Sequence, residues 1–203
     1  MISGFARAAA RAVALALLLA AASDDAVSAE TPDRIVDLKD AIAARLLLMN
    51  DVARYKWNAE LPVLDAARES ALLERTTDSA VAIGVPRDYA RRVVAAQIEA
   101  SRDLQQTVID RWRAERHGAF PRVPDLVTVQ RPAIERATAA LLVHLRDAMC
   151  KLGGQAGSAL ATPPPSLAST ARAWSIAVGA LWPPPDTCHL DESGRDHAAS
   201  PAR

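Results

Sequence analysis

The sequence predicts an all-α protein, a single helical domain of about five to six helices with a long first helix. Alanine, leucine and arginine are abundant among the 203 residues, and these residue types favour helices over strands. Half of the residues are hydrophobic, which is enough for one domain with a packed core. No stretch of any length alternates between apolar and polar residues as a strand would.

Apolar residues recur every three to four positions along most of the chain, which indicates amphipathic helices. Pro62 ends the first predicted helix, Gly84 caps the second, and Pro132 falls in or near the first turn of the fourth. The predicted helices span about residues 33–59, 64–83, 86–117, 132–151 and 166–181, with a linker at 117–125 and a Gly/Ala/Pro-rich loop at 153–165.

Residues 1–29 have the pattern of a signal peptide. Two arginines, Arg7 and Arg11, precede an apolar run over 12–22 that is too short to span a bilayer comfortably. Small residues up to Ala29 suit a cleavage site near that position. An uncleaved anchor helix is the alternative, although two aspartates end the apolar run early. We therefore expect a periplasmic or secreted protein whose mature form has no membrane segment.

The mature chain is predicted to form one helical domain over 30–190. Its first half, about 33–116, and its C-terminal half, about 125–190, are joined by the predicted linker. Residues 191–203 are polar and are predicted to be a disordered tail. The 24 basic and 24 acidic residues give a formal net charge of zero, which disfavours a nucleic-acid-binding protein.

The chain has two cysteines, Cys150 and Cys188. Export would place them in an oxidising compartment, where two cysteines predict one disulfide. Two unrelated buried thiols are the alternative.

Charged and polar residues fall at spacings that predict shared helix faces. Arg45 and Lys56 are eleven residues apart, so on one helix they differ in direction by only about 20°. The second and third predicted helices repeat the pattern, with Asp65, Arg68, Glu69 and Leu72 at i, i+3, i+4 and i+7, and Gln97, Ser101 and Gln105 at i, i+4 and i+8.

Each of these faces also has an ordinary explanation. The two cations of the first helix would extend their long side chains to solvent. The second helix would carry an exposed ladder of salt bridges, and the third helix would carry a stripe of solvated polar side chains. If the three faces converge instead, they enclose a small pocket with fixed cations and neutral hydrogen-bonding groups. Such a pocket suits a small dianion.

Four segments together resemble the helical chorismate mutase family. They are Arg45-Leu46, DVARYKWN at 51–58, LPVLDAARE at 61–69 and QIEASRDLQ at 97–105. The resemblance is close over 38–113 and is strongest to the exported subclass, which carries a signal peptide and a longer C-terminal half. It implies a chorismate mutase II-like fold and suggests a homodimer.

The resemblance also implies a role for each matching residue. Lys56 and Gln105 would donate to the ether oxygen of the substrate, where negative charge grows as the C–O bond breaks. The substrate carboxylates would be bound by Arg45, Arg68, Lys56 and Ser101. Asp65 and Glu69 would bind the substrate hydroxyl and neighbouring cations. Arg131 would complete the site, in place of an arginine that the partner subunit supplies in the intracellular branch of the family.

The implied activity is the unimolecular rearrangement of chorismate to prephenate. This reaction needs no nucleophile, metal or proton transfer, so no cofactor is expected. The main alternative is a non-catalytic helical periplasmic module that binds a small dianionic metabolite, which would explain the cations but not the pairing of Lys56 with Gln105. A structural helical protein with chance charges is the third hypothesis.

Overall fold

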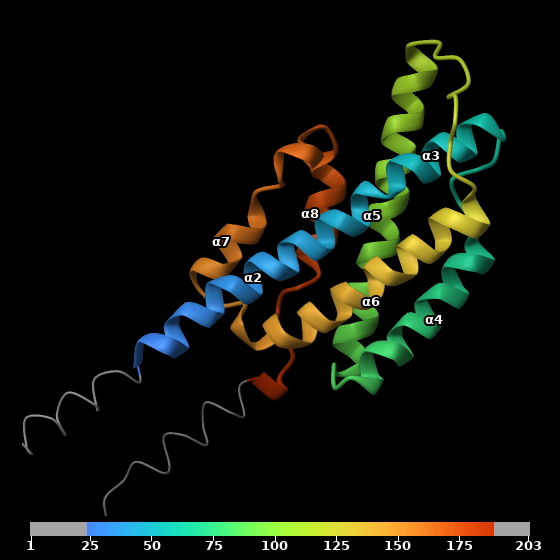
Figure 1. Cartoon of the computed structure of the whole chain (residues 1–203). Coiled ribbons are helices and arrows are strands. Elements are labelled where there is room, and N and C mark those ends of the chain that lie inside the picture. Colours follow the sequence, from blue (N-terminus) through green and yellow to red (C-terminus); the bar gives the residue numbers. More distant parts are fainter. Residues whose placement is uncertain (1–23, 189–203) are drawn as a thin grey trace, which may run out of the picture.

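A computed structural model describes the backbone of residues 24–188 and the side chains of 34–154 and 157–188. Over this range the chain forms helices and connecting turns, with no strand, which confirms the all-α prediction. Most of the expected signal peptide and the polar tail at 191–203 lie outside the described residues. The helices, shown in Figure 1, are α2 (Asp24–Leu47), α3 (Met49–Asn58), α4 (Ala66–Ala82), α5 (Arg87–Ala114), η2 (Leu126–Gln130), α6 (Arg131–Ala148), η3 (Met149–Lys151), α7 (Gln155–Ala161), η4 (Pro165–Thr170) and α8 (Ala171–Gly179).

The long first helix begins earlier than predicted and is interrupted once. It starts at Asp24 rather than near residue 33, and Leu48 separates α2 from α3. The side-chain amide of Asn50 donates to the Leu47 carbonyl at 3.3 Å, a local bond that competes with the helical pattern. Leu48 keeps helical dihedral angles, with φ −61° and ψ −23°, so α3 continues the direction of α2 (Figure 1).

Two turns join the next helices where the sequence predicted them. The Asp65 carboxylate caps α4 by accepting from the Arg68 backbone N–H at 3.1 Å, which satisfies one free donor of the first turn. Gly84 follows α4 with φ +96°, a conformation that side chains disfavour, and Pro86 caps α5. These turns fold α4 back along α5, against which it packs.

The C-terminal half differs from the prediction in three places. The helix predicted at 166–181 is a 3-10 segment, η4, followed by the shorter α8, and an unpredicted π-helical turn, η2, precedes α6. Residues 155–161 form α7, although this segment was expected to be part of an irregular loop. Leu160 is fully buried and accepts at its carbonyl from the Trp174 indole N–H at 2.8 Å. One buried leucine in a run of small residues leaves no apolar period to detect, so the sequence pattern gave no sign of this short helix.

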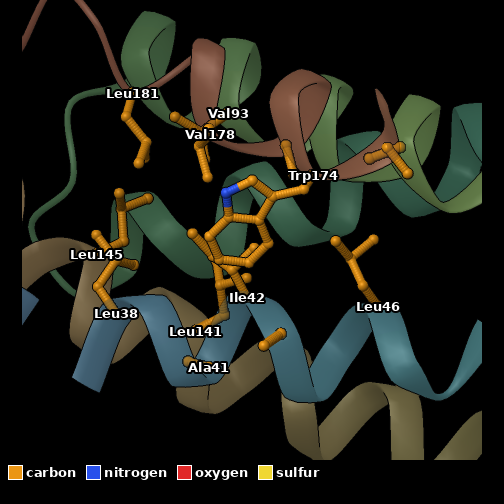
Figure 2. Packing of buried hydrophobic residues seen from close by; sticks show 14 of the residues in the cluster. Leu38, Ala41, Ile42, Leu46, Val93, Leu141, Leu145, Trp174, Val178 and Leu181 are labelled. Carbon is orange, nitrogen blue, oxygen red and sulfur yellow. The ribbon is translucent and has the colours of Figure 1, made fainter. Parts of the chain in front are cut away.

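The core lies between α2 and the helices that surround it. Leu38, Ile42 and Leu46 on α2 are fully buried, and α2 packs against α6 while α5 packs against α8. Figure 2 shows the indole ring of Trp174, from α8, pointing into this core towards Ile42. The C-terminal half therefore covers the inner face of α2, which holds that helix in a fixed position.

A disulfide joins Cys150, just beyond α6, to Cys188, as the sequence predicted. The two Cα atoms are 5.1 Å apart, and the bond closes a loop across 38 positions. It fixes the end of the described chain to the helix that packs on α2. Within residues 24–188, no helix combines the length and the apolarity needed to cross a membrane.

Free-thiol titration of the denatured, unreduced protein should give close to zero thiols per chain. Closing a loop of this length removes unfolded-state entropy worth roughly 4 kcal/mol in the chain-entropy model. The Cys150→Ser/Cys188→Ser double variant should therefore melt at a clearly lower temperature than the wild type. Two titratable thiols in the exported protein, or an unchanged melting temperature, would contradict this prediction.

Candidate functional site

A cavity of about 390 Å³ lies between α2, α3, α4, α5 and the start of α6. Side chains from the three polar faces predicted from helical spacing meet there, and Glu69 also forms an ion pair with Arg102. Apolar side chains such as Met49, Val52 and Ile134 fill the space between the polar groups. The expected substrate-binding residues line this cavity, namely Arg45, Lys56, Asp65, Arg68, Glu69, Ser101, Gln105 and Arg131. Gln97 of the third polar face does not line it, and its backbone carbonyl instead accepts from Arg45.

Arg45 is the most deeply placed charge, with only 3% of the residue exposed. Its Nη1 donates to the Gln97 carbonyl at 3.0 Å and to the Ser101 hydroxyl at 2.7 Å, and its Nε donates to Thr138 Oγ1 at 3.2 Å. It forms no ion pair with any described residue. Burial lowers the pKa of Arg45 to about 10, so the guanidinium remains charged at neutral pH. A buried cation held only by neutral groups lacks the counter-ion that buried charges usually have, so it could accept an anion.

Lys56 lies near the end of α3 and is half-buried. Its Nζ donates to the Val63 carbonyl at 2.7 Å, so the loop between α3 and α4 holds the ammonium group over the cavity. Burial lowers the pKa of Lys56, and the nearby carboxylates of Asp65 and Glu69 oppose this shift. An ammonium group has three donors, so two remain for a ligand.

Two arginines from different helices approach each other at the cavity. Burial lowers the pKa of Arg68, and the charge of Arg131 lowers it further. Arg131 is the first residue of α6, and its buried Nε has no hydrogen-bond partner among the described residues. The repulsion between the two cations would be relieved by an anion placed between them.

A π-helical turn sets the position of Arg131. Asp125 caps this turn, η2, by accepting from the backbone N–H groups of Val127 and Thr128. Gln130, buried at the end of η2, donates to the carbonyls of Asp51 and Pro124. Single π-helical turns occur frequently at functional sites. This one ties α3 to the start of α6 and so brings the last predicted cation to the cavity.

Gln105 is the neutral donor of the set. It is 6% exposed, and its Nε2 donates to the Ser101 carbonyl at 2.9 Å and contacts Met49 Sδ at 3.7 Å. Its Oε1 has no hydrogen-bond partner among the described residues. The amide is thus buried in the cavity wall. Its unused atom among the described residues is an acceptor, so Nε2 must exchange one of its present contacts to donate to a ligand.

The site also contains groups that the sequence analysis missed. Arg102 lines the cavity and pairs with Glu69 at 3.2 Å, while Thr138 contacts Arg45 from α6. Thr138 lies seven residues after Arg131, a helical spacing that could have suggested a shared face. Five cationic side chains and two carboxylates line the cavity, an excess of three positive charges. Among the described residues, no group of His, Cys, Asp or Glu could hold a metal ion.

Fold and cavity together define an all-helical protein with a cation-rich pocket for a small anion. The family model of chorismate mutase type II matches residues 36–106. The crystal structure of a chorismate mutase from Burkholderia thailandensis has 32% identity and a TM-score of 0.64, covering 73% of this chain and 98% of that one. The chain therefore belongs to the chorismate mutase type II family.

Two further comparisons agree with this assignment. A secreted chorismate mutase from Mycobacterium tuberculosis is 30% identical over 117 residues, and the match spans 58% of this chain and 58% of that relative. The crystal structure of a chorismate mutase from Burkholderia phymatum has 22% identity and a TM-score of 0.67, covering 73% of this chain and 96% of that one. The latter likeness supports the fold.

Replacing Arg45 by Met should leave the free energy of unfolding unchanged or raise it by about 1 kcal/mol. Met keeps most of the apolar stem and removes a buried charge that has no counter-ion among the described residues. Urea unfolding at neutral pH measures the effect, with Arg111→Met, an exposed position on α5, as the matched control. A loss above about 2 kcal/mol would mean that the guanidinium hydrogen bonds outweigh the cost of burying the charge.

Proposed function

We propose that this protein is an exported chorismate mutase that converts chorismate to prephenate. The observation that carries the proposal is the convergence of all eight expected side chains on one cavity with excess positive charge. Family membership supports the same activity, and the secreted relative supports export.

The cavity suits the substrate in charge. Chorismate carries two carboxylates, and the excess of three cationic side chains would attract and hold such a dianion. In this proposal Arg45 and Ser101 bind one carboxylate deep in the pocket, while Arg68 and Arg131 act nearer the α4–α6 side. Fixing both carboxylates favours the compact conformer in which the reacting carbon atoms meet. Positioning therefore lowers much of the activation barrier.

The remaining polar groups act on the bond that breaks. Lys56 and Gln105 donate to the ether oxygen, and both bonds strengthen as negative charge grows there in the transition state. Burial makes these donors more effective, because few water molecules compete with them. Asp65 and Glu69 bind the substrate hydroxyl and keep Lys56 charged. No residue needs to gain or lose a proton, so no cofactor enters the reaction.

Turnover of chorismate alone tests the proposal. A chain comprising residues 30–203, without any added cofactor, should deplete chorismate, followed by its ultraviolet absorbance. A binding module for a dianionic metabolite would instead raise the melting temperature with chorismate and leave its concentration constant. Absence of turnover by folded protein would reject the enzyme.

We also propose signal-peptide cleavage near Ala29 and assembly into a homodimer. Cleavage there would remove the first turns of α2 and leave every cavity residue in the mature chain. Val36 and Leu47 are exposed by 52% and 38% and lie on one side of α2, which gives a second copy an apolar surface to bury.

Lys56→Ala and Arg68→Ala should each lower kcat/KM by at least about 100-fold, because charged donors in a dry site contribute more than one order of magnitude each. Steady-state kinetics on variants with native helical content measure the loss. Arg54→Ala is the control, since Arg54 lies on α3 but pairs with Asp51 outside the cavity. Near-wild-type kinetics of either cavity variant would show that the site is wrongly assigned.

The wild-type kcat should be nearly flat from about pH 5 to 8, because the Gln105 amide does not titrate and the cations stay charged. Gln105→Glu should introduce a titration. Its carboxyl can donate to the ether oxygen only while protonated, so activity should be present at low pH and fall as the carboxyl ionises. Paired pH–rate profiles measure this, and identical profiles would mean that residue 105 does not contact the reacting oxygen.

A further inference from the structure

We propose that Thr138 is a positioning residue, which orients the guanidinium of Arg45 so that one edge faces the substrate. This inference rests on the proposed function, because it concerns the carboxylate that Arg45 would bind. Neither the family motifs quoted above nor the polar faces of the first three predicted helices include Thr138. It belongs to the C-terminal half, 93 positions from Arg45 in the sequence.

The hydrogen bonds of Arg45 define a fixed plane. A guanidinium has five N–H groups in one plane. Three of them are used, because Nε donates to Thr138 Oγ1 and Nη1 donates to both the Gln97 carbonyl and the Ser101 hydroxyl. The Nη2 group forms no hydrogen bond with the described residues. The contacts on Nε and Nη1 therefore leave the Nη2 edge of the group for a ligand.

Thr138 is the contact that prevents rotation. The Gln97 carbonyl and the Ser101 hydroxyl both lie on α5 and both bind Nη1, so they hold one end of the group. Without the bond at Nε, the plane could turn about that end. Thr138 restrains it from the opposite side, because α6 packs along α2, from which Arg45 projects.

The same face of α6 carries other groups of the site. Arg131 and Ile134 line the cavity, and Thr138 follows Arg131 at i+7 and Ile134 at i+4, both helical spacings. This face of α6 therefore carries Arg131 to the cavity at the start of the helix, and about two turns later Thr138 orients Arg45. The C-terminal half thus contributes to the geometry of the site beyond the single residue Arg131.

The proposal predicts which kinetic constant changes. Loss of the Thr138 bond leaves the charge of Arg45 and the other substrate contacts in place, so the compact conformer is still favoured. A carboxylate keeps its charge throughout the rearrangement, so the part of its binding that depends on Thr138 is about equal in ground state and transition state. Loss of such uniform binding raises KM more than it lowers kcat. Thr138→Val, which keeps the shape and removes the acceptor, should raise KM at least about tenfold and change kcat by less than about threefold. Thr138→Ser restores the hydroxyl and should stay within about twofold of the wild type in both constants.

Two controls separate orientation from packing. Thr107→Val makes the same change at an exposed position of α5 and should leave both constants unchanged. The Nε–Hε resonance of Arg45 in nitrogen–proton correlation spectra reports the hydrogen bond without using activity. It should be protected from solvent exchange in the wild type and in Thr138→Ser, and shifted or lost in Thr138→Val. If Thr138→Val does not fold, Thr138→Ala takes its place in the same comparison with Thr138→Ser.

The outcomes distinguish the two proposals. An unchanged KM in folded Thr138→Val, or equal impairment of the Ser and Val variants, overturns the role of Thr138 as a hydrogen-bonding residue. An Arg45 Nε–Hε signal that is the same in all variants overturns it as well. A wild-type protein that does not turn over chorismate rejects the proposed function, and the resonance then still decides whether Thr138 orients Arg45.

Discussion

The buried charge of Arg45 is the constraint on which the arrangement of the site depends. Desolvating a guanidinium is costly, and this one is compensated by a carbonyl and two hydroxyl groups instead of a carboxylate. A protein carboxylate there would occupy the position that a ligand should take. The neutral partners come from α5 and α6, so both helices must pack closely on α2 for the charge to be tolerated. Correct helix packing and a functional pocket are therefore the same structural requirement.

The two halves of the chain have different tasks. Helices α2 to α5 supply nearly all of the polar groups of the cavity, whereas α6 packs along α2 and α8 packs along α5. Gln97 links the two tasks, because its backbone carbonyl binds Arg45 and its side-chain Nε2 donates to the Ala177 carbonyl of α8 at 3.1 Å. Stability of the C-terminal half thus affects the geometry of the N-terminal half directly.

Much of the site could be predicted because helical spacing fixes which residues share a face. Arg45 and Lys56 remained on one side of the first helix, since Leu48 interrupts it with little change of direction. Spacing does not say which faces meet, and that step came from the family resemblance. Thr138 escaped prediction because its partner is distant in the sequence, and α7 because a single buried leucine has no period. The interruption at Leu48 coincides with one side-chain bond from Asn50, which no average propensity encodes.

All the side chains that line the cavity belong to one polypeptide, with Arg131 contributed by α6 of the same chain. Under the proposed function, the pocket therefore forms within one chain and takes no side chain from a second copy. A site shared between subunits is lost on dilution once the concentration falls below the dissociation constant of the assembly. A pocket built within one chain has no such threshold, which would suit the export that we propose.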